Sequence, residues 1–217
     1  MQNGTIARWQ LGLLGFTSDA IALRLKRALL HRVYRGVYLV GHTSTNNLAL
    51  PTAALLAIGP GSSLSHYTAA GLREIARLPE GIVDVTLPGA QRKSRKGLRI
   101  HGHILQPHDI RRLNGLPVTT AARTVTQLAH LVHYRELERL VDQALIRKQA
   151  TVDELRAAAH GTPAMLRMLE VPGDIAGARS RAEAKLKRLI VRAGLPSPAS
   201  TRIVAGFECD LVCGRSG

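Results

Sequence analysis

The most constraining feature of the sequence is a change of hydrophobic period near its N-terminus. Ser18 is a suitable helix N-cap, and the apolar residues after it fall on one helical stripe, at Ile21, Leu25, Ala28 and Leu29. Gly15 suits the left-handed residue that ends a preceding short helix. Residues 30–40 place β-branched and aromatic side chains on both sides of Gly36, which is typical of a two-stranded hairpin. This order predicts a winged helix-turn-helix over residues 1–45.

Charge favours nucleic acid as the partner of such a module. The chain has 30 Lys and Arg against 15 Asp and Glu, a net charge of +15, although a basic surface without a ligand gives the same count. Only 3% of the residues are aromatic, which argues against stacking on single strands and favours duplex DNA. The residues expected to contact DNA are Arg24, Lys26 and Arg27 on the helix and Arg32 and Arg35 on the hairpin. The same pattern is also typical of a solvated helix flank.

A second basic group follows in the middle of the chain. Residues 92–99 contain five positive charges and no negative ones, at Arg92, Lys93, Arg95, Lys96 and Arg99. We expect this loop either to grip phosphates beside the hairpin or to be an ordinary solvated loop.

The rest of the chain predicts an α+β protein. Breakers, strand-like alternation and capping residues indicate helices at 48–58 and 66–75, paired strands at 82–88 and 98–105, and a third short strand before a helix capped by Thr119 or Thr120. Helices then continue to Leu169, one of them starting at a capping box on Thr151. We therefore expect a mixed α/β domain with a helical extension over 46–172, a linker at 171–178 and a last piece over 178–217.

Several runs also resemble a known family. The run S-D-A-I-A-L-R-L-K-R-A-L-L-H-R-V-Y-R-G-V-Y-L-V-G looks like the N-terminal winged helix of AbiEi-type antitoxins of type IV toxin-antitoxin systems. Three later runs resemble the same architecture: L-S-H-Y-T-A-A at 64–70, V-D-V-T-L-P at 83–88 and G-L-P-V-T-T-A-A-R-T at 115–124.

This resemblance implies a function. Members of the family bind operator DNA through the winged helix to repress their own operon, and the following domain is the antitoxin for a nucleotidyltransferase-type toxin. We therefore expect a sequence-specific DNA-binding repressor of a toxin-antitoxin or phage-defence operon, or else an interaction module that neutralises a toxin and touches DNA weakly. The first helix is short here, with only I-A-R-W-Q before Leu11, which is expected to weaken binding.

The C-terminal region resembles a different family. Residues 180–193 followed by V-A-G-F-E-C-D-L-V resemble the start of very-short-patch-repair (Vsr) endonucleases, with Glu183 and Asp210 at the positions of metal-binding acids. The alternative function is therefore a Mg²⁺-dependent DNA endonuclease. The later acidic strand of that restriction-endonuclease-like fold does not follow, so we expect an incomplete fragment and no independent cleavage. Glu183 also completes a capping box with Ser180.

No other motif suggests a cofactor or a catalytic centre. His101, His103 and His108 are expected to be exposed, because zinc needs three or four organised ligands, and Cys209 and Cys213 are expected to be free thiols. No run of eighteen apolar residues and no signal-peptide pattern occurs, so neither a membrane partner nor export is expected and the cytoplasm is the expected location.

Overall fold

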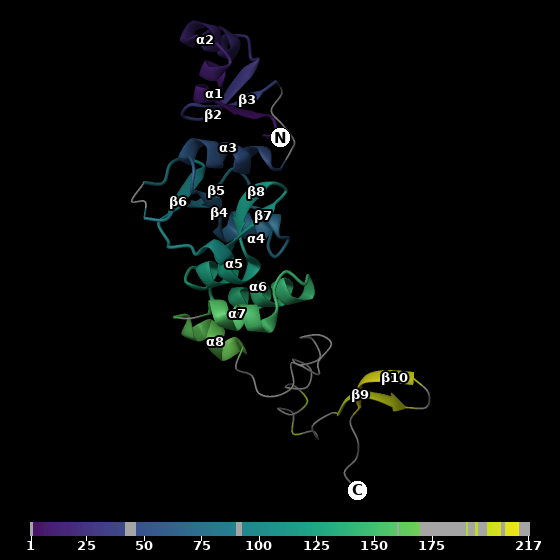
Figure 1. The fold of residues 1–217 in the computed structure, drawn as a ribbon. Helices are drawn as coiled ribbons and strands as arrows, with labels where there is room; N and C mark the ends of the chain where they lie inside the picture. The colour runs from purple at the N-terminus through teal and green to yellow at the C-terminus, as the bar shows by residue number, and fades with distance from the viewer. Residues whose placement is uncertain are drawn as a thin grey trace. The chain divides into compact units, whose positions relative to one another are not determined.

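The chain divides into two units, Met1–Ala159 and His160–Gly217, which are considered separately. The computed structural model describes residues 2–41, 47–89, 93–159, 161–169, 190, 194, 199–204 and 207–212 (Figure 1). Helices and antiparallel or mixed sheets occur together, so the fold class is α+β, as predicted. The predicted linker at 171–178 lies outside the described residues.

The chain begins with two short helices and a small sheet. The elements are β1 (Thr5–Ala7), α1 (Arg8–Leu13), α2 (Ser18–Lys26), β2 (Leu30–Tyr34) and β3 (Val37–Val40). The predicted hairpin is present as β2 and β3, and β1, which was not predicted, pairs with β3 to give the antiparallel order β1-β3-β2. A small core of Leu11, Ile21, Leu30 and Tyr38 holds the helices on the sheet.

The boundaries of these helices differ in part from the prediction. Gly15 has a φ of +81° and ends α1, as expected, with the Phe16 N–H donating to the Leu11 carbonyl. The N-cap of α2 is Thr17, whose hydroxyl accepts from the Ala20 N–H, so the assignment of the cap to Ser18 was wrong. Helix α2 also ends earlier than its apolar stripe suggested, because Ala28 adopts a left-handed φ of +54°.

A five-stranded sheet forms the centre of the first unit. Its elements are α3 (Ala49–Ile58), β4 (Ser63–Leu64), α4 (His66–Leu72), β5 (Val83–Thr86), β6 (Leu98–His101), a 3₁₀ turn η1 (Pro107–Asp109), β7 (Ile110–Leu113) and β8 (Leu116–Thr119). The strand order is β6-β5-β4-β8-β7. The predicted pair β5 and β6 is parallel, and both strands are shorter than expected.

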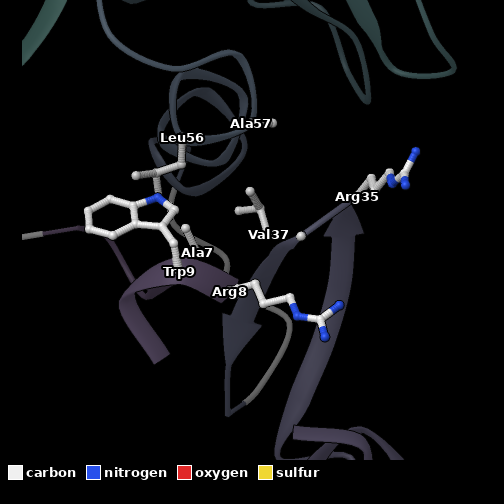
Figure 2. A pocket seen from close by; sticks show the side chains of 8 residues that line it. Ala7, Arg8, Trp9, Arg35, Val37, Leu56 and Ala57 are labelled. Atoms are coloured by element: carbon white, nitrogen blue, oxygen red, sulfur yellow. The ribbon is translucent and has the colours of Figure 1, made fainter. Parts of the chain in front are cut away.

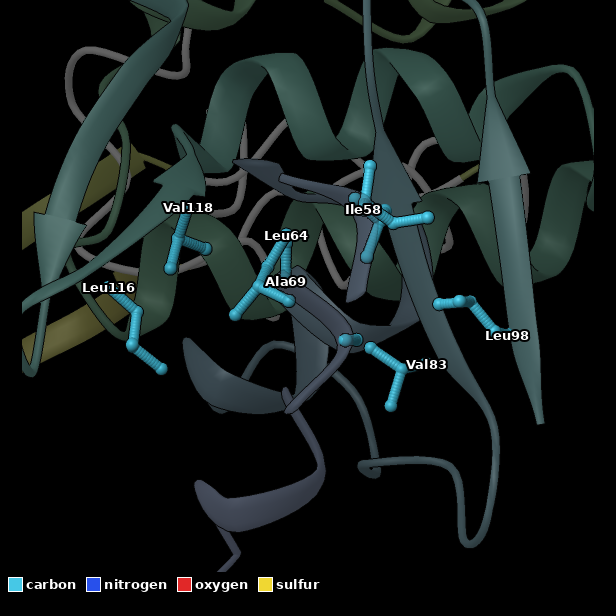
Figure 3. Close-up of a cluster of buried hydrophobic side chains, with 9 residues drawn as sticks. Ile58, Leu64, Ala69, Val83, Leu98, Leu116 and Val118 are labelled. Atoms are coloured by element: carbon cyan, nitrogen blue, oxygen red, sulfur yellow. The ribbon is translucent and has the colours of Figure 1, made fainter. Parts of the chain in front are cut away.

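The two faces of this sheet differ in chemistry. Side chains alternate along a strand, so Val83 and Val85 of β5 lie in the apolar core, which Figure 3 shows together with Leu64, Leu98 and Val118. Asp84 and Thr86 lie on the opposite face, yet both are buried. These two polar side chains are therefore enclosed by protein and not solvated, because helices cover the sheet on both sides.

Helix α3 packs against both sheets of the first unit. Its Ala53 packs with Ala7 and Val37 of the N-terminal sheet, while Ala54 and Ile58 belong to the core of the five-stranded sheet. Figure 1 shows α3 between the two sheets, with the helices of residues 121–158 beyond the five-stranded sheet. The N-terminal module and the central sheet are therefore joined by a shared helix.

Helices complete the first unit, as predicted. They are α5 (Ala121–Ala129), capped by Thr120, α6 (Tyr134–Ile146) and α7 (Val152–Ala158), which begins at the predicted capping box on Thr151. The second unit contains α8 (Pro163–Leu169) and an antiparallel hairpin of β9 (Ala199–Val204) and β10 (Phe207–Val212). In the described part of the chain, no helix has the length and apolar character needed to cross a membrane.

Candidate functional site

The residues predicted to bind DNA are mostly exposed. Lys26 and Arg27 lie at the end of α2, and Arg32 and Arg35 lie on β2 and its turn, all four of them solvent-accessible. Residues 2–41 contain six Lys and Arg but one acidic residue, Asp19, and no salt bridge is found among the described residues of this segment. Their charge is thus available to a polyanion.

Arg24 has a different environment from its neighbours. Its guanidinium donates to the Ala20 carbonyl at 3.0 Å and lies 4.4 Å from the centre of the Phe16 ring. The side chain is half-buried and stabilises the end of α2 through a cation–π contact. Arg24 therefore faces the protein on one side, which separates it from the freely extending Arg27.

A hydrogen bond brings the two predicted basic groups together. The Tyr34 hydroxyl donates to the Gly97 carbonyl at 3.0 Å, across 63 positions of sequence. Arg35 and Lys96 are the chain neighbours of these two residues, so the hairpin turn and the basic loop lie side by side. Burial raises the pKa of Tyr34 to about 12, so its hydroxyl keeps its proton and remains a donor.

The basic loop itself is exposed where it is described. Lys93, Arg95, Lys96 and Arg99 are solvent-accessible, and the loop closes through paired backbone hydrogen bonds between Arg95 and Leu98 of 2.8 and 2.9 Å. Arg92 lies outside the described residues. We call the exposed set Lys26, Arg27, Arg32, Arg35, Lys93, Arg95 and Lys96 the basic face.

A shallow pocket of about 510 Å³ borders the basic face. It is lined by residues of β1, α1, the hairpin and α3, including Arg8, Trp9, Arg35 and Leu56. Figure 2 shows the Trp9 ring beside Leu56, with the guanidinium groups of Arg8 and Arg35 extending on the other side. Arg8 was not among the predicted DNA contacts, and its exposure adds one more cation to this region.

A second site lies on the polar face of the central sheet. Sequence reasoning considered His101 and His103 as zinc ligands and rejected them, and it missed His66. His66, His101 and His103 each place a ring nitrogen within 4.8 Å of the others. The rings of His66 and His101 are stacked with centroids 3.6 Å apart, and His103 lies 5.5 Å from His66. We call these three residues the histidine cluster.

Buried polar groups surround the histidine cluster. His101 Nε2 donates to Asp84 Oδ1 at 2.9 Å, and His66 Nδ1 lies 2.9 Å from the Ser65 hydroxyl, which also accepts from Thr86. Two buried oxygens have no hydrogen-bond partner among the described residues, namely Asp84 Oδ2 and Gln127 Oε1. Unpartnered polar atoms at this depth cost free energy, which is typical of functional sites.

The environment of His66 and His103 favours their neutral imidazole forms. Burial, together with the neighbouring His101, His103 and Arg123, lowers the pKa of His66 to about 3. The pKa of His103 is also lowered, first by burial and then by His101. A neutral ring has a nitrogen lone pair, so these side chains can accept hydrogen bonds or bind a cation.

His66 also has a strained backbone. Its φ of +49° lies in the left-handed region, which a bulky side chain rarely adopts. Such strain persists only where the surrounding structure holds the residue in place, and it gathers at functional positions.

The expectation of exposed histidines is partly wrong. His103 and His108 are exposed, but His101 is largely covered, with 19% of its side chain accessible, because Asp84 and His66 pack against it. Strand register brings His101 opposite Thr86, next to Asp84. The sequence feature that could have indicated the site is the pair of polar residues in V-D-V-T, Asp84 and Thr86. The sequence alone does not reveal that these two side chains are buried.

The nuclease-like residues are only partly described. Glu183 and Cys213 lie outside the described residues, and Asp210 lies on β10 of the two-stranded hairpin. Cys209 on the same strand is a half-buried free thiol.

Comparisons with known proteins add the fold alone. No family model matches the sequence, and no curated protein matches it significantly. The structure is similar to the crystal structure of the Rv2827c protein from Mycobacterium tuberculosis, with a TM-score of 0.55 and 17% sequence identity over 84% of this chain and 75% of that one. At this level of identity, the chain shares with that protein its α+β architecture.

Proposed function

We propose that this chain is a DNA-binding transcriptional repressor whose N-terminal module, residues 2–41, is a winged helix-turn-helix. The observation that carries the proposal is the Tyr34–Gly97 hydrogen bond, because it joins the hairpin turn and the basic loop into one cationic surface. Helix α2 supplies Lys26 and Arg27 to the same module. In this proposal α2 enters the major groove, and the hairpin and the loop together bind phosphates next to it.

Duplex DNA fits this surface better than single strands. The cations of the basic face are exposed and carry no salt bridge among the described residues, whereas stacking platforms need several exposed aromatic rings. Trp9 is the one large aromatic side chain that is mostly exposed in residues 2–41, and it lies beside Leu56 rather than among the cations.

The resemblance to AbiEi-type antitoxins supports a more specific role. In this part of the proposal the chain represses a toxin-antitoxin or phage-defence operon in the cytoplasm, and its central domain neutralises a nucleotidyltransferase-type toxin. The runs that carry the resemblance, at 18–41, 64–70, 83–88 and 115–124, include α2, the hairpin and three strands of the central sheet.

The proposal is tested by removing charge from the basic face. We expect a chain that combines Arg27→Ala, Arg32→Ala and Arg35→Ala to bind the DNA upstream of the gene at least about 100-fold more weakly. A lost base contact costs about 1–3 kcal/mol, and a lost phosphate contact lowers the salt dependence of binding by about one unit of slope. Fluorescence anisotropy with labelled duplex measures the affinity.

The matched control removes the same kind of charge elsewhere. Arg135 on α6 is exposed, and Arg135→Ala is expected to leave affinity unchanged. Equal affinity of the triple variant and the parent chain would refute the DNA-binding surface. Adding Mg²⁺ or Mn²⁺ to the same mixture separates retention from cleavage, and cut DNA would favour the endonuclease alternative.

A further inference from the structure

The geometry points to a binding site for a first-row transition-metal ion, best suited to Zn²⁺, formed by His66, His101 and His103 with Asp84 and Ser65 as orienting partners. The three ligands come from separate parts of the chain. His66 begins α4, His101 ends β6, and His103 lies in the segment just after β6. The basic face does not include any of them, so the inference is independent of DNA binding.

The spacing of the ring nitrogens is close to what a metal requires. They lie within 4.8 Å of one another, whereas tetrahedral ligands with Zn–N distances of about 2.0–2.1 Å stand about 3.3 Å apart. Most of this shortening of the nitrogen–nitrogen distances can come from movement of His103, because its exposed side chain lies outside the strands. Imidazole nitrogens suit Zn²⁺, Cu²⁺ and Ni²⁺, but not Mg²⁺ or Ca²⁺.

Two of the rings are already oriented through their second nitrogen. His101 donates Nε2–H to Asp84, which leaves Nδ1 for a metal, and His66 Nδ1 lies against the Ser65 hydroxyl, which leaves Nε2. A carboxylate or hydroxyl behind each ligating histidine is the usual outer arrangement of zinc sites.

The buried carboxyl group of Asp84 also favours a cation. Only 2% of this side chain is accessible, and its Oδ2 has no hydrogen-bond partner among the described residues. A buried carboxyl oxygen without a partner is costly unless a donor or a cation lies nearby. A divalent ion on the histidine cluster would supply positive charge through His101.

The stacked rings must move slightly to bind a metal. The planes of His66 and His101 are inclined by 17°, so their in-plane lone pairs lie in nearly parallel planes, and ligation requires the rings to tilt until the lone pairs converge on one point. The χ2 torsion of histidine is broad, so a tilt of this kind costs little.

The site has three protein ligands and one open side. Because His103 is exposed, the fourth coordination position faces solvent and would hold water or a small anion, as in zinc sites that are open to reaction. Ser65, by contrast, is fully buried, so a serine nucleophile reached by substrate does not fit this geometry.

Metal titration of the untagged full-length chain tests the inference. After treatment with a chelator and dialysis, we expect one Zn²⁺ per chain in a competition titration, and Co²⁺ is expected to give the visible absorption of a tetrahedral complex. Loss of a residue that only hydrogen-bonds a metal ligand typically lowers the affinity about 10–100-fold. His101→Ala and His103→Ala each remove a ligand and should therefore lower the affinity for Zn²⁺ by more than this. Asp84→Asn should lower it by about 10–100-fold and keep the stoichiometry.

Two control variants make the test specific. His108 is exposed and outside the cluster, and Cys209 is a thiol in the other unit, so His108→Ala and Cys209→Ser should bind Zn²⁺ as the parent chain does. Circular dichroism checks folding, and if His101→Ala fails to fold, the exposed His103→Ala decides. Absence of Zn²⁺ binding, or binding that survives in a folded His103→Ala chain, would overturn the inference.

Discussion

At the scale of single residues, Gly71 is the most tightly enclosed of the glycines in the described part of the chain. A Cβ placed on it would lie 2.5 Å from the Leu78 Cα and 2.8 Å from the Leu78 Cβ. Backbone cannot yield as a flexible side-chain tip can, so this position on α4 accepts no side chain without movement of the segment that leads to β5.

We expect Gly71→Ala to lower the free energy of unfolding by about 1–3 kcal/mol, the usual cost of overpacking. Gly12 in α1 is the matched control, because a Cβ there meets no atom within 4 Å and alanine favours helix by up to about 1 kcal/mol. Urea denaturation of both variants measures the difference. A Gly71→Ala chain as stable as Gly12→Ala would contradict the close approach.

The histidine cluster shows why single residues of a site escape sequence reasoning. His66 was expected within a helix, and Asp84 and His101 within strands, and each lies in such an element. Their meeting depends on the parallel register of β5 with β6 and on the pairing of β5 with β4, the strand that leads into α4, and both pairings join segments far apart in the sequence. No local pattern encodes them, whereas the exposed arginines of the basic face were predicted directly from charge and amphipathicity.

At the scale of elements, helix starts follow the sequence more closely than helix ends. Thr120 and Thr151 act as side-chain caps where polar caps were expected. Three helices instead end on non-glycine residues in the left-handed conformation, Ala28, Glu74 and Lys148, which carry no recognisable stop signal. For the same reason α4 ends at Leu72, while Ile75 folds back and donates its N–H to Ala70.

Strand pairing was the other part that local patterns did not reveal. β1 and β4 span three and two residues, too few to show alternation, and each exists because a neighbouring strand supplies its hydrogen bonds. The parallel pairing of β5 and β6 likewise depends on a connection whose path is set by packing rather than by a turn motif.

The cap of α2 gives a test at this scale. We expect Thr17→Ala to destabilise the protein by about 1 kcal/mol, because the Ala20 N–H loses its acceptor. Ser18, which accepts only from the exposed Arg8 guanidinium, is the comparison, and Ser18→Ala should change stability by less than about 0.5 kcal/mol. Thermal unfolding followed by circular dichroism separates them, and a larger effect of Ser18→Ala would show that the cap is misassigned.

At the scale of the whole molecule, charge and domain structure make a joint prediction. If five residues of the basic face each neutralise one phosphate, the logarithm of the DNA association constant should fall with the logarithm of salt concentration with a slope of about −4 to −5. The whole basic face lies in the first unit, so residues 1–159 alone should give the same slope. Anisotropy titrations over a range of salt measure it, and a flat dependence or a loss of slope in the shorter chain would contradict the assignment.

Helix α3 has a mechanical consequence. Because Ala53 belongs to one core while Ala54 and Ile58 belong to the other, α3 cannot leave either sheet without exposing apolar surface of that sheet and of the helix. The N-terminal module is therefore packed against the central domain through α3 and is not tethered by a flexible linker alone. The orientation of the module toward a partner is therefore set when the central domain folds. Weakening the contact of α3 with either sheet would make that orientation variable.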